Sequence, residues 1–317
     1  MKKIVLSLAL LLLCIGSAVS QFDAQMSQYM FHTSSFNPAA VGEGDMIQLT
    51  GQHRLQWLGM PNGGQTTFFS INSPLKLQGI NQGVGLNFLN DKVGQFTNQA
   101  FHLQYAYKKK LGAGVLSAGV ELGFISLGFR GDSVLNHSIT LGDYHDMTAD
   151  PEIPKTAVVG MSFDMTVGVY YSTPNYYAGI SLIHLNNPTV DWGDRSKFRQ
   201  AATMYLTGGY NWVIPDSKFV FKPSTLIQTD FSSTQWDLTA RAEYDSKYWG
   251  GLSYRLNAIV VLAGINIAGG LSIGYSYDLP TSEILSVSSG SHEFMLQYSF
   301  EYVFGNRNSR YKSIRIL

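Results

Sequence analysis

Apolar and polar residues alternate along most of this chain. The stretch from His292 to Phe304 shows the pattern most clearly, because every second residue from Phe294 onward is a large apolar or aromatic one. Successive side chains of a β-strand point to opposite faces, so this stretch predicts a strand with one apolar and one more polar face. Similar stretches of about ten residues recur along the chain, which is typical of strands that cross a membrane in a β-barrel.

The alternation predicts about 14 strands between residues 45 and 304. The links after even-numbered strands are short, and the two longest links, residues 128–160 and 280–291, follow odd-numbered strands. With both termini in the periplasm, this places short turns on the periplasmic side and longer loops outside the cell. The expected fold class is therefore all-β, a transmembrane antiparallel outer-membrane β-barrel.

Aromatic residues crowd the predicted periplasmic turns, as expected for rings of side chains at a membrane interface. They are Tyr170, Tyr171, Tyr176, Tyr177, Trp212, Phe219, Tyr244, Tyr248 and Trp249.

The N-terminus has the order of regions found in a secretory signal peptide. Lys2 and Lys3 precede a short apolar run, and small residues follow. We expect residues 1–20 to be removed by cleavage between Ser20 and Gln21. Cys14 is the only cysteine, so the mature chain would have no disulfide and no thiol chemistry.

Three further segments are expected after the signal peptide. Residues 21–44 lack strand-like alternation and form a pre-barrel segment, which either plugs the lumen or lies at the periplasmic rim. Residues 45–304 form the barrel, and residues 305–317 form a basic tail.

Charged residues make up only 14% of the chain, with 22 basic and 22 acidic residues, so no basic excess indicates a nucleic-acid partner.

Charged residues on the polar faces of the predicted strands would point into the lumen. They are Arg54, Glu121, Asp237, Arg241, Glu243, Arg255 and Glu301. They could form a binding surface or a selectivity ring, or a network that packs the interior or holds the N-terminal segment. Selectivity rings usually carry one sign of charge, so the mixture of signs favours the network.

Candidate catalytic and metal-binding residues are few. Acidic residues within 143–152 would suit calcium, but their spacing matches no known calcium loop, and we expect a solvated surface. The chain has no HExxH or CxxC motif and no phosphate-binding glycine loop, so we expect neither a cofactor nor an enzyme. A hydrolase that uses His53 or His102 remains a distant alternative.

The three lysines at 108–110 are expected to be solvated at the periplasmic rim.

Short motifs in a fixed order resemble those of the PorP/SprF family, outer-membrane proteins of the type IX secretion system. The motif residues are Gln28, Tyr29, Met30, Phe31, Asn37, Pro38, Arg54, Gln56, Trp57, His184, Asn186, Pro188, His292 and Glu293. The set spans about residues 25 to 304, which is nearly the whole mature chain.

The resemblance implies a component of a machine that carries folded proteins to the cell surface, including adhesins used in gliding motility. The implied partners are outer-membrane lipid, periplasmic secretion-ring proteins and secreted cargo, and the motif residues are candidates for partner binding. The alternative is a general, porin-like solute channel, because a barrel of this strand number is wide enough for a pore.

Overall fold

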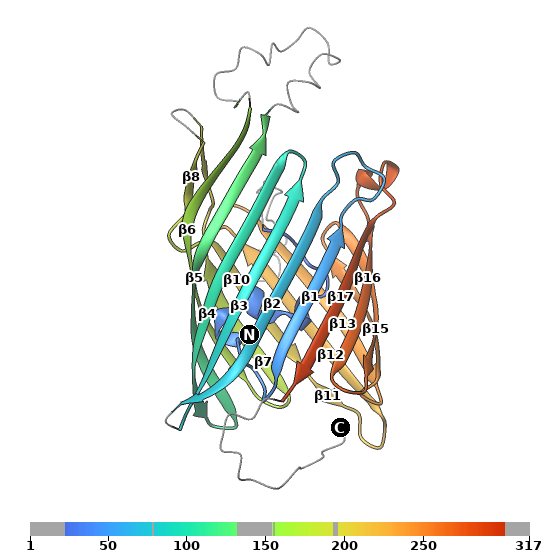
Figure 1. Ribbon diagram of the computed structural model, residues 1–317. Helices are drawn as coiled ribbons and strands as arrows, with labels where there is room; N and C mark the ends of the chain where they lie inside the picture. The colour runs from blue at the N-terminus through green and yellow to red at the C-terminus, as the bar shows by residue number, and fades with distance from the viewer. Residues whose placement is uncertain (1–22, 78, 132–153, 155, 193–195, 302–317) are drawn as a thin grey trace, which may run out of the picture.

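The computed structural model is a closed antiparallel barrel of 14 strands (Figure 1). It describes residues 23–77, 79–131, 154, 156–192 and 196–301. The first half of the wall consists of β1 (Ile47–Leu55), β2 (Gln65–Leu77), β3 (Ile80–Val93), β4 (Phe96–Leu111), β5 (Gly114–Arg130), β6 (Ala157–Ser172) and β7 (Tyr176–Ile183). The second half consists of β10 (Thr203–Tyr210), β12 (Phe219–Thr229), β13 (Thr234–Tyr244), β14 (Tyr248–Arg255), β15 (Ala258–Ile267), β16 (Leu271–Pro280) and β17 (Ser291–Phe300).

Sequential strands pair with one another around the wall, and β1 pairs with β17. The first and last strands pair from Ile47 opposite Phe300 to Leu55 opposite His292. Two-residue β11 (Trp212–Val213) follows β10 and also pairs with β12. No helix in the described part of the chain is long and apolar enough to cross a membrane.

The outer face of the wall is apolar, as the alternation predicts. Five phenylalanines pair directly across neighbouring strands and form one row on that face. This phenylalanine row consists of Phe69, Phe88, Phe101, Phe124 and Phe163, all of them exposed. Such a row suits the boundary between membrane and water on the extracellular side.

Several strand ends differ from the sequence prediction. The strands β5 and β6 are longer than predicted, so the loop between them is shorter than residues 128–160. The last strand ends at Phe300, and residues 302–304 lie outside the described part of the chain. The same is true of the signal peptide with its cleavage site after Ser20, of residues 143–152 in the acidic loop, and of the basic tail.

A short hairpin that the alternation does not predict lies in the extracellular mouth. It consists of β8 (Thr189–Asp191) and β9 (Lys197–Arg199). Its Val190 is fully buried against Ile125 and Leu127 of β5, and the indole nitrogen of Trp192 donates to the Leu127 carbonyl over 2.9 Å. These contacts place the hairpin against the inner face of the wall.

Some of the aromatic residues assigned to a membrane interface point inward instead. Tyr170 is 3% exposed and Trp249 is 4% exposed, and Tyr170 stacks on Tyr177 inside the barrel. The physical reason is the two-residue period of a strand, which sends neighbouring aromatic residues to opposite faces. Tyr176, Tyr244 and Tyr248 remain on the outer face and are exposed.

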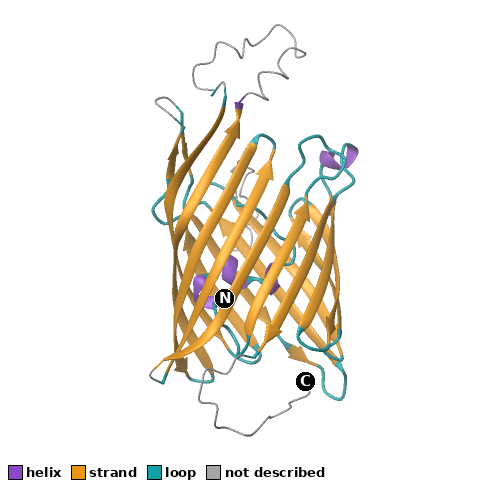
Figure 2. Ribbon diagram, in the orientation of Figure 1, coloured by secondary structure: helices purple, strands orange, loops and turns teal. Residues whose placement is uncertain are grey.

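Residues 23–41, here called the plug, lie inside the barrel, where Figure 2 shows helical turns. The turns are η1 (Tyr29–Phe31), η2 (Thr33–Ser35) and η3 (Pro38–Ala40). Another turn, η5 (Glu283–Ser286), belongs to the loop between β16 and β17. The sequence predicts either the lumen or the periplasmic rim as the location of the pre-barrel segment, and residues 23–41 lie in the lumen.

Candidate functional site: the plugged lumen

The plug is built from short turns because its sequence suits them better than a strand. Pro38 stands at the first position of η3, where its missing N–H costs nothing. Asn37 precedes it and accepts a hydrogen bond from the Ala39 amide over 3.0 Å, as an N-cap residue does. Asn37, Ala39 and Val41 are all fully buried, so the plug packs tightly against the wall at this level.

Asn37 also ties the plug to β6 and β7. Its side-chain nitrogen donates to the Val169 carbonyl over 3.1 Å and to the Ile180 carbonyl over 3.3 Å. Gly168 and Gly179 face it, and a Cβ atom on either glycine would collide with the Asn37 side chain. The wall therefore has space for this asparagine only because glycine stands at both positions.

One charged cluster, here called the arginine anchor, joins the plug to β1, β16 and β17. Arg54 lies 2.7 Å from Asp278 and 3.3 Å from Glu293. Glu293 accepts hydrogen bonds from the backbone amides of Ser27 at 2.7 Å and Gln28 at 2.9 Å. All of these groups are buried, so their charges depend on one another for compensation.

The arginine anchor continues into β13 and β14. Arg255 pairs with Asp237 at 2.6 Å and with Asp278 at 3.3 Å. The Ser27 hydroxyl donates to Asp278 and accepts from Arg54 over 2.9 Å. Two guanidinium groups and three carboxylates thus form one mixed-sign network around the start of the plug.

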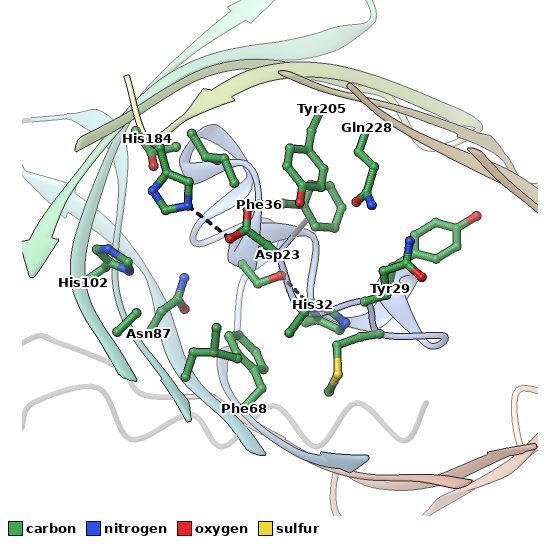
Figure 3. Close-up of a pocket in the computed structure, with 18 of the residues that line it drawn as sticks. Asp23, Tyr29, His32, Phe36, Phe68, Asn87, His102, His184, Tyr205 and Gln228 are labelled. Carbon is green, nitrogen blue, oxygen red and sulfur yellow. Dashed lines mark hydrogen bonds and ion pairs between the residues drawn. The ribbon is translucent and has the colours of Figure 1, made fainter. Parts of the chain in front are cut away.

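A second cluster, here called the histidine anchor, joins the plug to β4, β5 and β6 (Figure 3). His184 lies 3.1 Å from Asp23 of the plug and 2.9 Å from Asp164. Asp164 also pairs with His102 at 3.0 Å, and the other His102 nitrogen lies 3.7 Å from Glu121. This chain of five titratable groups leads from the plug to Glu121 on the inner face of β5.

The same cluster holds the middle of the plug through neutral side chains. The carbonyl of Ser34 accepts hydrogen bonds from Asn87 and Gln104. Both amides also donate to Glu121. Glu121 therefore orients two donors toward the plug.

A cavity of about 110 Å³ lies between the plug and the wall on the extracellular side. Figure 3 shows Asp23 of the plug pointing toward His184 beside the cavity, and Phe36 of the plug against Tyr205 of the wall. Burial lowers the pKa of His32 to about 3, so its ring is neutral at neutral pH. A second space, of about 650 Å³, opens at the periplasmic end and is lined by Gly42 and Lys108. The plug lies between the two spaces.

The remaining lumen charges of the sequence prediction are placed as follows. The Arg241 guanidinium lies 4.6 Å from the ring centroid of Phe31 in the plug, and Glu243 pairs with Lys222 at 2.7 Å. Glu301 is exposed and follows the end of β17, so its prediction as a member of the lumen wall is wrong because the strand ends one residue earlier. Lys108, expected in solvent, instead donates to the Gly42 carbonyl.

The motif residues fall into three places: the plug, the two anchors and the extracellular ends of strands. Gln28, Tyr29, Met30, Phe31, Asn37 and Pro38 belong to the plug, and the Tyr29 hydroxyl lies 3.0 Å from that of Ser224. Arg54, Glu293 and His184 belong to the anchors. The others lie at the extracellular ends of strands: Gln56, Trp57, Asn186, Pro188 and His292. Trp57 takes a left-handed backbone conformation with φ of 54°, and its amide donates to Ser291 over 3.1 Å.

Sequence reasoning missed Asp23, Ser27, Asp164 and Asp278. A signal was present for the last two, because both occupy alternate positions on the polar faces of predicted strands. Asp23 and Ser27 carried no signal, since their partners are far away in sequence. In the described part of the chain, no group of three or more His, Cys, Asp or Glu residues is arranged to bind a metal ion.

The fold and the lumen define a membrane-embedded outer-membrane β-barrel whose interior holds its own N-terminal segment. The family described as type IX secretion system membrane protein PorP/SprF matches residues 18–298. The chain belongs to this family. It is localised to the outer membrane, in agreement with the family and the fold.

One solved structure confirms the type of fold. A structure titled CymD monoaromatic hydrocarbon channel is similar with a TM-score of 0.50 and 12% identity, covering 91% of this chain and 96% of that chain. The Pseudomonas putida toluene transporter TodX has a TM-score of 0.46 and 11% identity, covering 90% of this chain and 94% of that chain. No curated protein has a significantly similar sequence.

Proposed function

We propose that this chain is an accessory component of type IX secretion that acts by binding proteins. Its partners would be secretion-machinery proteins on the periplasmic side and cargo such as the surface adhesins used in gliding motility. The family supports the secretion role. The plug supports binding rather than conduction, because both anchors hold it inside the lumen.

The observation that carries the proposal is the number of wall strands that hold the plug. Side chains of β1, β3, β4, β7, β12 and β17 form hydrogen bonds with it. Each such bond contributes about 1 kcal/mol net, so together they make release of the plug costly.

A general solute channel is the second candidate. It is favoured by the similarity to CymD, whose title names a channel, and by the periplasmic opening of about 650 Å³. This function would require the plug to leave the lumen or to rearrange. The two candidates therefore differ in whether the protein conducts while its plug is seated.

The secretion role is tested by deleting the gene and comparing culture medium, cell surface and periplasm with the complemented strain by mass spectrometry. We expect one or a few surface proteins to disappear from outside the cell and to accumulate or be degraded in the periplasm. Unchanged surface and secreted proteins, together with reduced uptake of a small solute, would overturn the proposal in favour of the channel.

A further inference from the structure

The extracellular part of β6 has an open edge. Pairing of β6 with β5 continues to Ala157 opposite Arg130, whereas pairing with β7 begins only at Val167. Within the described part of the chain, residues 157–163 therefore have a hydrogen-bonded neighbouring strand on one side only, while Val190 and Asp191 of β8 lie against Gly160 of this segment.

The backbone groups at this edge can be assigned from their neighbours. The Met165 amide and carbonyl bond to Asn186 at 3.2 Å and to the Leu185 amide at 2.9 Å, on the β7 side. In an antiparallel sheet the amide and the carbonyl of one residue point toward the same neighbouring strand, and this direction repeats at every second residue. The amides and carbonyls of Val159 and Met161 therefore point toward the β7 side, as those of Met165 do. No described residue forms a hydrogen bond with their amides or carbonyls there.

Asn186 marks the lower end of the open edge. Its side-chain nitrogen donates to the Phe163 carbonyl over 2.7 Å, and its side-chain oxygen accepts from the Met165 amide. The side chain thus replaces one residue of a pairing strand. Above it, the edge continues without a described partner.

The outward side chains of this segment differ from those of its neighbours. The row next to the phenylalanine row on the extracellular side consists of Thr67, Asn90, Gln99, Ser126 and Met161. The following row consists of Gln65, Lys92, Thr97, Gly128 and Val159. Only β6 contributes a large apolar side chain to either row, and Met161 is 67% and Val159 71% exposed.

We propose that residues 157–163 of β6 bind an extended, uncharged segment of another exported protein by β-strand addition. Unpaired amides and carbonyls in a row fit the backbone of a strand, and the exposed Val159 and Met161 fit apolar side chains on alternate positions. The segment has no charged residue and no proline, which are the usual protections of a free edge. This proposal rests on the proposed secretion role and names a site for one of its partners.

Two other occupants fit less well. Lipid tails cannot satisfy backbone donors and acceptors, and the site lies beyond the phenylalanine row. A second copy in the same membrane is related by an axis along the membrane normal, so both β6 strands run in the same direction. That axis cannot produce an antiparallel edge-to-edge pair.

The test places a photoreactive p-benzoylphenylalanine at position 161 of the full-length protein in living cells. The control places it at position 252, where Leu252 is 58% exposed on the outer face. Adducts are identified by mass spectrometry of the cross-linked peptides. We expect an adduct at 161, absent at 252, with an extended uncharged segment of an exported protein.

The second variant is Val159→Pro, with Val159→Thr as its matched control. The Val159 amide points away from β5, so proline leaves the β5–β6 ladder intact but blocks an incoming strand. We expect barrel assembly to be normal and the adduct yield to fall about tenfold, the effect of about one lost hydrogen bond. Val159→Thr should keep the yield.

Three results would overturn the inference: no adduct at 161 above the control, an adduct with a second copy of this chain, or a yield that Val159→Pro leaves unchanged. These are separate from failure of the secretion role, which is shown by an unchanged set of surface proteins in the full deletion strain.

Discussion

Arg54 shows how much of the plug attachment depends on one side chain. It touches Ser27 of the plug, Asp278 of β16 and Glu293 of β17, and it is 3% exposed. Glu293 in turn binds two plug amides. Removal of Arg54 therefore leaves buried carboxylates without their guanidinium partner.

We predict that Arg54→Ala lowers the free energy of unfolding by about 3 kcal/mol, the usual cost of breaking a buried ion pair. Urea titration of the barrel in lipid vesicles measures this change. The control is Lys197→Ala, which removes an ion pair with Asp191 whose side chains are 63% and 60% exposed. It should change the free energy by less than about 1 kcal/mol, and equal effects of both variants would contradict the role of the arginine anchor.

Asn37 both caps η3 and binds the wall, and two substitutions at this position distinguish the two roles. Asn37→Ala loses both functions, and we predict a destabilisation of about 2 kcal/mol from the cap and the wall bonds together. Asn37→Asp keeps an acceptor for the Ala39 amide but cannot donate to the carbonyls of Val169 and Ile180. It should be at least as destabilising as Asn37→Ala in the same titration, whereas near-normal stability of Asn37→Asp would mean that the wall bonds contribute little.

At the scale of elements, the plug and the wall have complementary shapes. A Cβ atom at Gly119 of β5 would collide with backbone atoms of Pro38 and Ala39. A Cβ atom at Gly83 of β3 would collide with the backbone of Val41. Because backbone atoms cannot move aside as a flexible side chain can, η3 and the residue after it can be seated only against glycine.

We predict that Gly119→Ala displaces η3 while the barrel still assembles. Limited proteolysis of the purified protein in detergent should then cleave the plug several times faster than in the wild type. The control is Gly208→Ala in β10, where an added Cβ would have its nearest neighbour at 3.6 Å. Equal protection of the plug in Gly119→Ala and the wild type would show that close packing at η3 does not hold it.

The sequence predicts the strands well because the alternation of apolar and polar side chains within a strand depends only on residues that are neighbours in the sequence. Arg54, Asp237 and Arg255 could be assigned to the lumen from that period alone. The pairing of Arg54 with Asp278 could not, because it depends on which strands become neighbours when the barrel closes. The same holds for Asp23 and His184, which are far apart in sequence, and for Tyr170 and Trp249, whose aromatic character suggested the membrane rather than the lumen.

At the scale of the whole molecule, the wall and the plug form one unit. The wall supplies charged and amide side chains around the lumen, and the plug supplies amides, carbonyls and small residues that fit them. The extracellular end adds the β8–β9 hairpin inside the mouth and an open edge on β6. The molecule is therefore suited to presenting surfaces at both membrane faces while its interior holds the plug.

The conductance of single molecules in planar lipid bilayers tests this account most directly. The full-length protein is compared with a variant that lacks residues 24–40, after both are shown to assemble as barrels. We expect the full-length protein to show no sustained open state and the deletion variant to conduct ions steadily. A large, steady conductance of the full-length protein, equal to that of the deletion variant, would contradict a seated plug and favour the solute channel.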